Sequence, residues 1–405
     1  MESLITDTST STHPVIGVFP NNWEFSRFGR EFERSNERNG DSPIGPMLSV
    51  SEYRGIEVRT NFRDGQLPSE DVSHYRVVRP GQLVANLMWL DHGGLGVSQL
   101  PGYVSPAYMA FNISERVDPA FAHHVLRSSV YVDSYKRLGR GVRPNSQMVD
   151  SVDLRQLPFP LPPFETQQRI ADYLDRETAE IDAAVADLDK YVELLELRAR
   201  TLIKQQLSGD HPQVKMGLLA DAIIGITYSP NDVVEEGGTK VYRSGNVQDS
   251  RINRQNMLAV NVEIPPHLRF QEDDILMCSR NGSANLVGKN AIVGPEDLGH
   301  TWGAFMTVIR SDLNRYLFWF FRSPQFDAHR GLFSTSTINQ LTTGILNRIP
   351  VPLPPRGQRD EIVKALELEV EEIDALIAES IKLRDLLLKR RSVLITEVVT
   401  GRKRV

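Results

Sequence analysis

The sequence predicts an α+β protein: two globular domains with small β-sheets are joined and separated by two long antiparallel coiled-coil helices, with a pseudo-two-fold internal repeat. Three observations support this prediction. Residues 158–209 return as residues 350–401 at a constant offset of 192 positions, without a gap and with about 20 identities in about 52 aligned positions. Each repeated segment carries a heptad pattern, and the other segments mix short apolar runs with glycine and proline. A gapless repeat at about half of the 405-residue chain indicates two copies of one module.

Each repeated segment begins with a proline-rich stretch and continues as a predicted helix. Pro160-Leu161-Pro162-Pro163 introduces the first copy, and Pro352-Leu353-Pro354-Pro355 introduces the second. No proline or glycine follows until Gly209 in the first copy, or from about residue 358 until Gly401 in the second. We therefore expect two rods of roughly 65 Å that end near these glycines.

Apolar residues recur at every seventh position of both predicted helices, which is typical of a coiled-coil seam. The seam residues are Leu174, Ile181, Leu188, Leu195, Leu202, Leu366, Ile373, Leu387 and Leu394. Neighbouring positions add Val185, Val192, Leu376 and Leu383. Ser380 stands where the register expects an apolar residue, either as a tolerated site near the surface or as a polar residue that sets the register.

A seam needs a partner, and the other copy in the same chain is the simplest one. A compact domain links the two helices, which permits an antiparallel pair. The alternatives are that each helix lies on its own globular domain, or that both helices drive dimerisation.

The predicted order along the chain is globular, helix, globular, helix. The segments are a disordered tail at 1–14, a globular domain at 15–157, a helix at 158–209, a second globular domain at 210–349, a helix at 350–401 and a basic tail at 402–405. Short apolar runs predict strands, at residues 75–78, 82–89, 291–293 and 305–309. Tyr316–Phe321 is a predicted buried helical turn that ends at Ser323-Pro324.

Composition restricts the class of protein. The chain has 40% hydrophobic and 24% charged residues, as expected for a globular protein. A single cysteine, Cys278, excludes an intramolecular disulfide and a cysteine metal cluster, so we expect a reducing, cytoplasmic setting. No signal-peptide pattern or membrane-length apolar run is present. The basic residues of both globular segments are nearly all arginine, which suits bidentate recognition but is explained equally well by high-GC codon usage.

Motifs for catalysis are missing. Gly282 and Gly288-Lys289 have the wrong spacing for a phosphate loop, and Asn290 stands where Ser or Thr should bind magnesium. His123-His124 lacks a zinc-binding pattern, so we expect these histidines at the surface or in a loop. Serine-hydrolase, dinucleotide-binding, amino-methyltransferase and acidic nuclease motifs are also absent. The sequence therefore favours a binding or adapter protein with no cofactor and no metal of its own.

The paired Pro-Leu-Pro-Pro segments, each before a long helix, resemble the specificity subunits of type I restriction–modification systems. The resemblance covers nearly the whole chain in architecture. Its local pattern, Pro-x-x-x-Gln at the helix start, is present at Pro163–Ile170 and departs by one position at Pro355–Ile362. Residues 241–247 and 274–283 resemble recurrent stretches of the family's target-recognition domains, and residues 81–86 and 102–108 correspond in the first domain.

The resemblance implies a non-catalytic reader of double-stranded DNA. Each target-recognition domain would read one half of a bipartite DNA site, and the helices would set the spacer between the halves. The helices would also dock two adenine-N6 methyltransferase subunits, which carry S-adenosylmethionine. A separate motor–nuclease subunit would cleave unmodified DNA.

Candidate DNA-binding residues are polar or basic and follow glycine-containing loops. Base reading uses Arg on guanine and Asn or Gln on adenine. In the first domain the candidates are Lys136, Arg137, Arg140, Arg143, Asn145 and Ser146. In the second domain they are Arg243, Ser244, Asn246, Ser279, Arg280, Asn281, Ser283, Thr335, Thr337, Asn339 and Gln340. Arg140–Asn145 is expected roughly where residues 332–337 lie in the second domain.

Three other functions remain open at this point. One is a coiled-coil scaffold with two sugar- or peptide-binding domains. Another is a standalone DNA-binding protein or nuclease with an unrecognised active site. The third is a reader in a methylation-only system without a nuclease.

Overall fold

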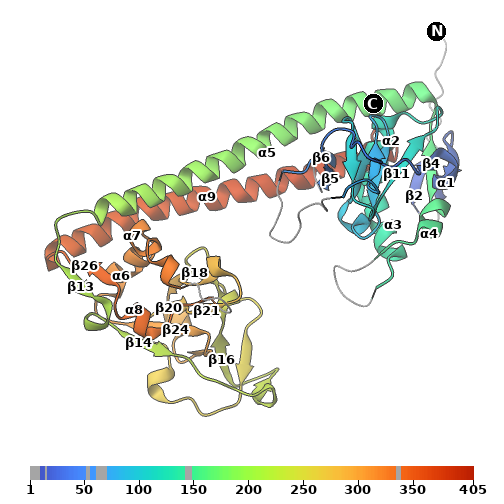
Figure 1. Cartoon of the computed structure of the whole chain (residues 1–405). Helices are drawn as coiled ribbons and strands as arrows, with labels where there is room; N and C mark the ends of the chain where they lie inside the picture. The colour runs from blue at the N-terminus through green and yellow to red at the C-terminus, as the bar shows by residue number, and fades with distance from the viewer. Residues whose placement is uncertain (1–9, 14–15, 52–54, 61–70, 142–147, 334–338) are drawn as a thin grey trace, which may run out of the picture. The chain divides into compact units, whose positions relative to one another are not determined.

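The computed structural model describes residues 10–13, 16–51, 55–60, 71–141, 148–333 and 339–405 (Figure 1). The chain divides into two compact units, Met1–Leu188 with Lys382–Val405 and Asp189–Ile381. Each unit therefore combines one globular domain with part of both long helices. This division differs from the predicted boundaries because the ends of the helices pack into the cores of the globular domains.

The first domain is built on a four-stranded antiparallel sheet. Its order is β4 (Phe32–Ser35), β11 (Tyr108–Ile113), β8 (Leu83–Asn86) and β9 (Leu95–Val97). Leu83, Val84 and Ala85 are fully buried, so β8 lies in the middle of the core. Such a continuous apolar run is typical of a strand covered on both faces.

Smaller elements complete the first domain. The remaining strands pair in antiparallel ribbons: β1 (Thr10–His13) with β2 (Gly17–Pro20), β3 (Glu24–Arg27) with β12 (Pro158–Leu161), β5 (Leu48–Ser51) with β6 (Gly55–Val58), and β7 (Arg76–Val78) with β10 (Gly102–Val104). The helices are α1 (Phe28–Glu31), α2 (Pro119–Arg127), α3 (Ser129–Leu138) and α4 (Ser151–Gln156).

The second domain repeats this sheet with another sequence. Its order is β14 (Asp221–Ile224), β24 (Met306–Arg310), β20 (Ile275–Cys278) and β22 (Asn290–Ile292), again antiparallel throughout. In both domains the chain visits the sheet in the same order, first edge, third position, other edge and then second position. The central sheets of the globular domains are therefore copies of one topology, although the domain sequences align poorly.

A second sheet and short ribbons surround it. The sheet contains β15 (Val233–Val234), β19 (Leu258–Val260), β16 (Thr239–Tyr242) and β23 (Thr301–Trp302), and the ribbons are β13 (Gln213–Lys215) with β26 (Pro350–Pro352), β17 (Val247–Gln248) with β18 (Arg251–Ile252), and β21 (Arg280–Asn281) with β25 (Asn339–Gln340). The helices are α6 (Asn314–Phe321), α7 (Pro324–Asp327) and α8 (Thr343–Leu346). The predicted helical turn at Tyr316–Phe321 is confirmed as part of α6 and is buried.

The two long helices are α5 (Phe164–Gln206) and α9 (Arg356–Val399). Each begins shortly after its proline-rich strand, and that strand pairs with an early strand of the same domain. Beyond α9, Gly401 adopts a left-handed backbone with φ of 71°, the conformation that favours glycine after a helix. The predicted antiparallel helix pair is confirmed.

The predicted seam is buried or half-buried in both units. In the first, Leu174 of α5 shares a core with Ile395 and Val398 of α9. In the second, Leu195 of α5 shares a core with Leu366 and Ile373 of α9. Half-buried positions complete the seam, at Leu188, Leu202, Leu387 and Leu394. Ser380 is buried as well, and its hydroxyl donates to the Leu376 carbonyl oxygen at 2.8 Å.

Three expectations were wrong. Thr10–His13 form strand β1, so disorder does not extend through the whole of 1–14; residues 1–9 lie outside the described part of the chain. Leu376 and Leu383 are 36% and 48% exposed, because they lie beside the seam rather than in it. His123 and His124 lie in α2, where His124 is buried.

Within the described residues, no helix is both long enough and apolar enough to cross a membrane. No group of three or more His, Cys, Asp or Glu side chains in that part of the chain is placed to hold a metal ion.

Candidate nucleic-acid interface

Three separate segments of the second domain converge after strand β20. Arg280 and Asn281 pair as strand β21 with Gln340 and Asn339 of β25. Asn339 Nδ2 donates to the Gly282 carbonyl oxygen at 3.1 Å, and Asn281 Nδ2 donates to Ser244 Oγ at 3.4 Å. We refer to Ser244, Arg280, Asn281, Asn339 and Gln340 as the polar cluster. The structure thus brings together candidates that the sequence placed almost 100 residues apart.

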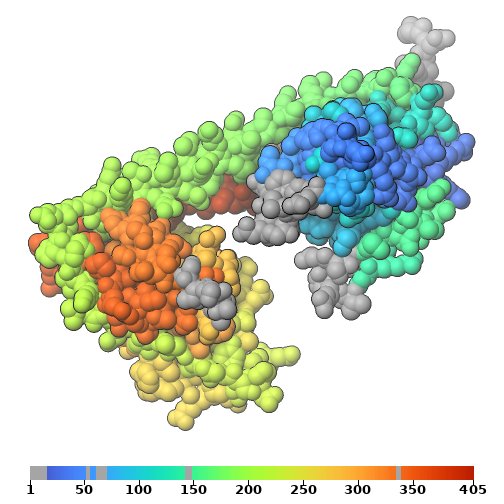
Figure 2. All heavy atoms as spheres, in the orientation of Figure 1, coloured from blue at the N-terminus to red at the C-terminus, as the bar shows by residue number. Residues whose placement is uncertain are grey.

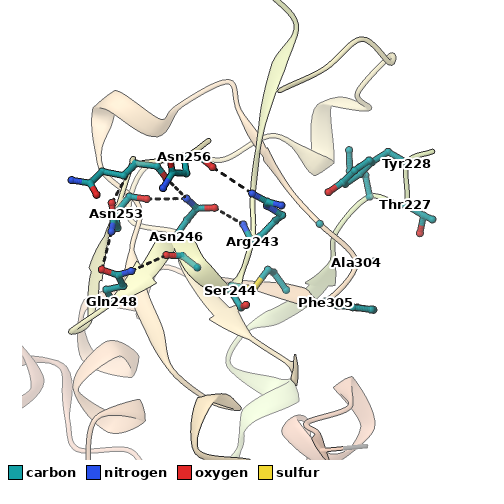
Figure 3. A pocket seen from close by; sticks show the side chains of 15 residues that line it. Thr227, Tyr228, Arg243, Ser244, Asn246, Gln248, Asn253, Asn256, Ala304 and Phe305 are labelled. Carbon is teal, nitrogen blue, oxygen red and sulfur yellow. Dashed lines mark hydrogen bonds between the residues drawn. The ribbon is translucent and has the colours of Figure 1, made fainter. Parts of the chain in front are cut away.

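A hollow of about 710 Å³ lies beside this cluster (Figure 3). Figure 3 shows Asn246 and Asn253 on one side of it, with Thr227 and Tyr228 across from them. Phe305 is 59% exposed at this hollow, and the guanidinium of Arg280 lies 5.4 Å from the centre of its ring. Such a cation–π contact positions the guanidinium without using its hydrogen-bond donors.

Two of the predicted residues support the site from beneath. Asn246 is buried, accepts a hydrogen bond from the Arg243 backbone N–H, and donates to the carbonyl oxygens of Asn253 and Gln255. Ser279 is buried and donates to the Phe305 carbonyl oxygen. Since both side chains are buried and hydrogen-bond to backbone groups, they stabilise the loops and are not free to contact a ligand.

The other second-domain candidates have different surroundings. Arg243 is exposed, and its Nη2 donates to the Asn256 carbonyl oxygen at 3.4 Å (Figure 3). Ser283 is exposed, and its backbone N–H donates to Asn281 Oδ1. Thr335 and Thr337 lie outside the described residues.

A buried ionic group fixes the loop that borders the hollow. Asp297 accepts hydrogen bonds from the Tyr242 hydroxyl at 2.6 Å and from Arg254 Nε and Nη2, both at 2.9 Å. Burial acts to raise the pKa of Asp297, but the hydrogen bonds from Arg254 and Tyr242 outweigh it and hold that pKa below its ordinary value. Arg254 lies between Asn253 and Gln255, which both line the hollow. No local sequence pattern predicts this group, because Asp297 is 43 residues from Arg254.

In the first domain, the candidates that the structure describes lie on α3 and just beyond it. Lys136 is exposed and approaches Asp133 at 3.7 Å, and Arg137 Nη2 donates to Ser134 Oγ at 3.0 Å. Arg140 bonds to Asp153 at 2.7 Å while its backbone pairs with Met148. Arg143, Asn145 and Ser146 lie outside the described residues.

The two domains correspond position by position at this place. The Leu341 backbone N–H donates to the Ser279 carbonyl oxygen at 2.8 Å, and the Val149 N–H donates to the Leu87 carbonyl oxygen at 3.1 Å. Both members of the first bond are offset by 192 residues from those of the second, the same offset as in the helices. The expectation that Arg140–Asn145 corresponds to residues 332–337 stays a prediction, because residues 142–147 and 334–338 lie outside the described part of the chain.

This correspondence places Met88 and Trp89 where the second domain has Arg280 and Asn281. Met88 is 49% exposed and Trp89 is 47% exposed. Sequence reasoning missed them as site residues because the apolar run 82–89 was interpreted as one strand, whereas β8 ends at Asn86. The signal that could have found them is the repeat offset continued into the globular domains.

Both long helices contain the sequence Glu-Ile-Asp-Ala, at residues 180–183 and 372–375, and the aspartate of each copy anchors its helix. Asp374 on α9 binds Arg322, which follows α6 and also stacks on Trp319 at 4.9 Å. Burial holds the pKa of Arg322 below its ordinary value, against the opposing effect of Asp374. Asp182 on α5 binds Arg391 of α9 through two hydrogen bonds of 2.8 and 3.1 Å. The aspartate of the second copy thus attaches the globular domain to α9 in the second unit. The equivalent aspartate of the first copy joins α5 to α9 in the first unit.

The first domain is attached to the helices by other contacts. His124 of α2 lies 2.7 Å from Asp175 of α5. Gln167 of α5 is buried, donates to the Arg116 and Pro162 carbonyl oxygens and accepts from the Asp118 backbone N–H. Gln167 belongs to the Pro-x-x-x-Gln pattern, which therefore has a structural role here.

Comparison with known proteins identifies relatives along the whole chain. No family model matches. The chain is 20% identical to a Methanocaldococcus jannaschii protein assigned as the specificity subunit of type I restriction enzyme MjaX, over 96% of each chain. It is 24% identical to the type I restriction enzyme EcoKI specificity subunit of Escherichia coli K12, over 61% of this chain and 57% of that protein.

A solved structure shares the fold. A chain from a structure of a type I restriction–modification system is matched with a TM-score of 0.65 and 16% identity, over 95% of this chain and 99% of the other. The matches confirm the resemblance to type I specificity subunits and the predicted fold class. The relatives are named for specificity rather than for methylation or cleavage, in agreement with the prediction of a non-catalytic subunit.

Proposed function

We propose that this chain is the DNA sequence-specificity subunit of a type I restriction–modification complex. One observation carries the proposal: two domains whose central four-stranded sheets have the same strand order present different side chains at corresponding positions. Copies that bound the same ligand would keep the same contact residues. Divergence at the contact positions, on a repeated scaffold, suits a protein that reads two different half-sites of one DNA target.

The side chains in the second domain suit base reading. Arg243 and Arg280 carry the planar donor forks that pair with guanine, and Asn and Gln amides pair with adenine. Gln255 and Asn256 are exposed at the rim of the hollow and add two amides to the polar cluster. The Asp297–Arg254 ion pair keeps this loop in place before DNA arrives, which reduces the ordering cost of binding.

The long helices support a second role, the docking of two identical methyltransferase subunits. Tyr191 and Leu194 on α5 are 44% and 54% exposed in the second unit. Their counterparts on α9, Leu383 and Leu386, are 48% and 55% exposed in the first unit. The side of α5 that faces the viewer is uncovered in the space-filling view (Figure 2). Apolar residues exposed at the same repeat positions suit two copies of one partner.

The methyltransferase subunits would supply S-adenosylmethionine and the transfer of its methyl group to adenine N6. This chain would supply the choice of sequence and the spacing of the two half-sites. A motor–nuclease subunit would join the same complex for cleavage.

Single-molecule sequencing of DNA from cells that co-express this chain with its methyltransferase tests the proposal. We expect N6-methyladenine in a split motif, lost when this chain is omitted. Replacing residues 15–157 by the corresponding domain of a relative should change one half of the motif and leave the other half intact. Absence of any split motif, with both proteins expressed and soluble, would refute the proposal.

A further inference from the structure

Two adjacent large apolar side chains protrude from the first domain into solvent. Met88 and Trp89 are each about half exposed, whereas their neighbours Leu87 and Leu90 are buried. Large apolar side chains that remain exposed beside buried ones of the same loop often mark a binding surface.

The backbone holds this protrusion outward. Asn86 Oδ1 accepts from the Met88 N–H at 3.2 Å, and the Asn86 carbonyl oxygen accepts from the Trp89 N–H at 2.9 Å. The Trp89 carbonyl oxygen accepts from the Gly94 N–H at 2.7 Å. A Cβ at Gly94 would lie 2.4 Å from that oxygen, so this close approach requires glycine. The turn is therefore preorganised rather than pliable.

The surroundings of the protrusion include an exposed cation. Asp91 and His92 follow in the same loop and line a hollow of about 310 Å³ together with Lys136, whose side chain is 56% exposed. The rings of Trp89 and His92 are 5.4 Å apart. An exposed lysine beside exposed apolar side chains suits DNA, whose phosphates attract the cation while base edges meet the apolar groups.

We propose that Met88 and Trp89 form the base-reading tip of the first domain, and that they read the 5-methyl group of a thymine. The inference rests on the proposed function. Its basis is the repeat: the Val149–Leu87 and Leu341–Ser279 hydrogen bonds put this pair at the position of Arg280 and Asn281. The thymine methyl is the apolar group that bases present in the major groove. The two domains thus contact bases from equivalent positions of the fold, through apolar side chains in the first domain and polar side chains in the second.

The test removes that methyl group. The full chain, in complex with its methyltransferase, binds duplexes in which each thymine of the first half-site is replaced in turn by deoxyuridine. Wild-type complex should bind about fourfold more weakly at one such position, the loss expected for one buried methyl group. A Trp89→Ala complex should bind the thymine and deoxyuridine duplexes equally, because the contact is already lost.

Controls separate this result from misfolding. Val152→Ala, at a residue 64% exposed on α4 of the same unit, should keep the wild-type sensitivity. Reading of the second half-site by the Trp89→Ala complex reports that the chain is folded, and Met88→Ala provides a milder second variant. Equal binding of all deoxyuridine duplexes by wild type, or retained sensitivity in both variants, overturns the inference. Absence of any split motif in the wild-type methylome overturns the proposed function instead.

Discussion

Asp297 is a residue whose charge is maintained inside the protein. Its side chain is fully buried, yet Tyr242 and Arg254 supply enough hydrogen bonds to favour the carboxylate. Arg254 remains 44% exposed on its side chain and also reaches Glu296 at 3.1 Å. A buried carboxylate held in this way ties the loop beside the hollow to the folded core.

Replacement of this carboxylate should destabilise the second domain. We expect Asp297→Asn to lower the free energy of unfolding by about 1.5–3 kcal/mol, the usual range for hydrogen bonds to a charged group. Chemical denaturation of the purified chain measures the change. Asp249→Asn, at an exposed nearby residue that already has a positive φ, is the matched control and should have little effect. An unchanged midpoint in Asp297→Asn would show that the ion pair is dispensable.

The same residue predicts a dependence of stability on pH. The pKa of Asp297 in the folded chain is below the ordinary value of 3.8. The carboxylate therefore stabilises the folded state above pH 3.8, and this contribution is lost as the pH falls through the folded pKa. Thermal unfolding of wild type between pH 5 and pH 2 should show a steeper loss of stability than Asp297→Asn. Parallel curves would contradict the assignment.

At the scale of elements, the two long helices have a buried apolar seam and a separate exposed apolar flank. Seam residues such as Leu195 and Leu366 are buried and hold the pair together, whereas Leu194 and Leu386 are exposed on the same helices. A heptad pattern in the sequence separates seam positions from flank positions only where the flank residues are polar, because an apolar flank residue looks like part of the seam. Leu376 and Leu383 were wrongly predicted for the seam for this reason.

Charge placed on the exposed apolar flank should release one methyltransferase at a time. We expect Leu194→Asp and Leu386→Asp each to give a complex with one methyltransferase subunit, and the double variant to give the free chain. A charge in an apolar contact carries a desolvation cost without a partner. Light scattering of the co-purified complexes gives the stoichiometry. Leu218→Asp, at a residue 79% exposed outside the long helices, should keep two subunits. Two retained subunits in the double variant would exclude this surface.

At the scale of the whole molecule, the internal repeat can be recognised from the sequence of the two long helices, but not from the sequences of the two globular domains. The helices share a seam pattern, and about 20 of their residues are identical between copies. The sheets share only a topology, since buried strands accept many apolar sequences. Pairing such as Arg280 with Gln340 joins residues far apart in the chain, and no local pattern predicts it. The Arg254–Asp297 group was missed for the same reason, whereas Met88 and Trp89 were missed because the apolar run 82–89 was interpreted as one strand.

The repeated helices also predict how the target changes when the chain is lengthened. One heptad inserted after Leu188 in α5, together with one at the equivalent position after Ser380 in α9, preserves the seam register. Seven residues add about 10.5 Å of helix, which corresponds to about three base pairs at roughly 3.4 Å each. We therefore expect a methylated motif with both half-sites unchanged and a spacer longer by about three base pairs. Insertion of three residues at both places rotates the apolar stripe out of the seam and should abolish methylation. Sequencing of the methylated genome distinguishes the cases, and an unchanged spacer in the heptad variant would show that the helices do not set the distance between the half-sites.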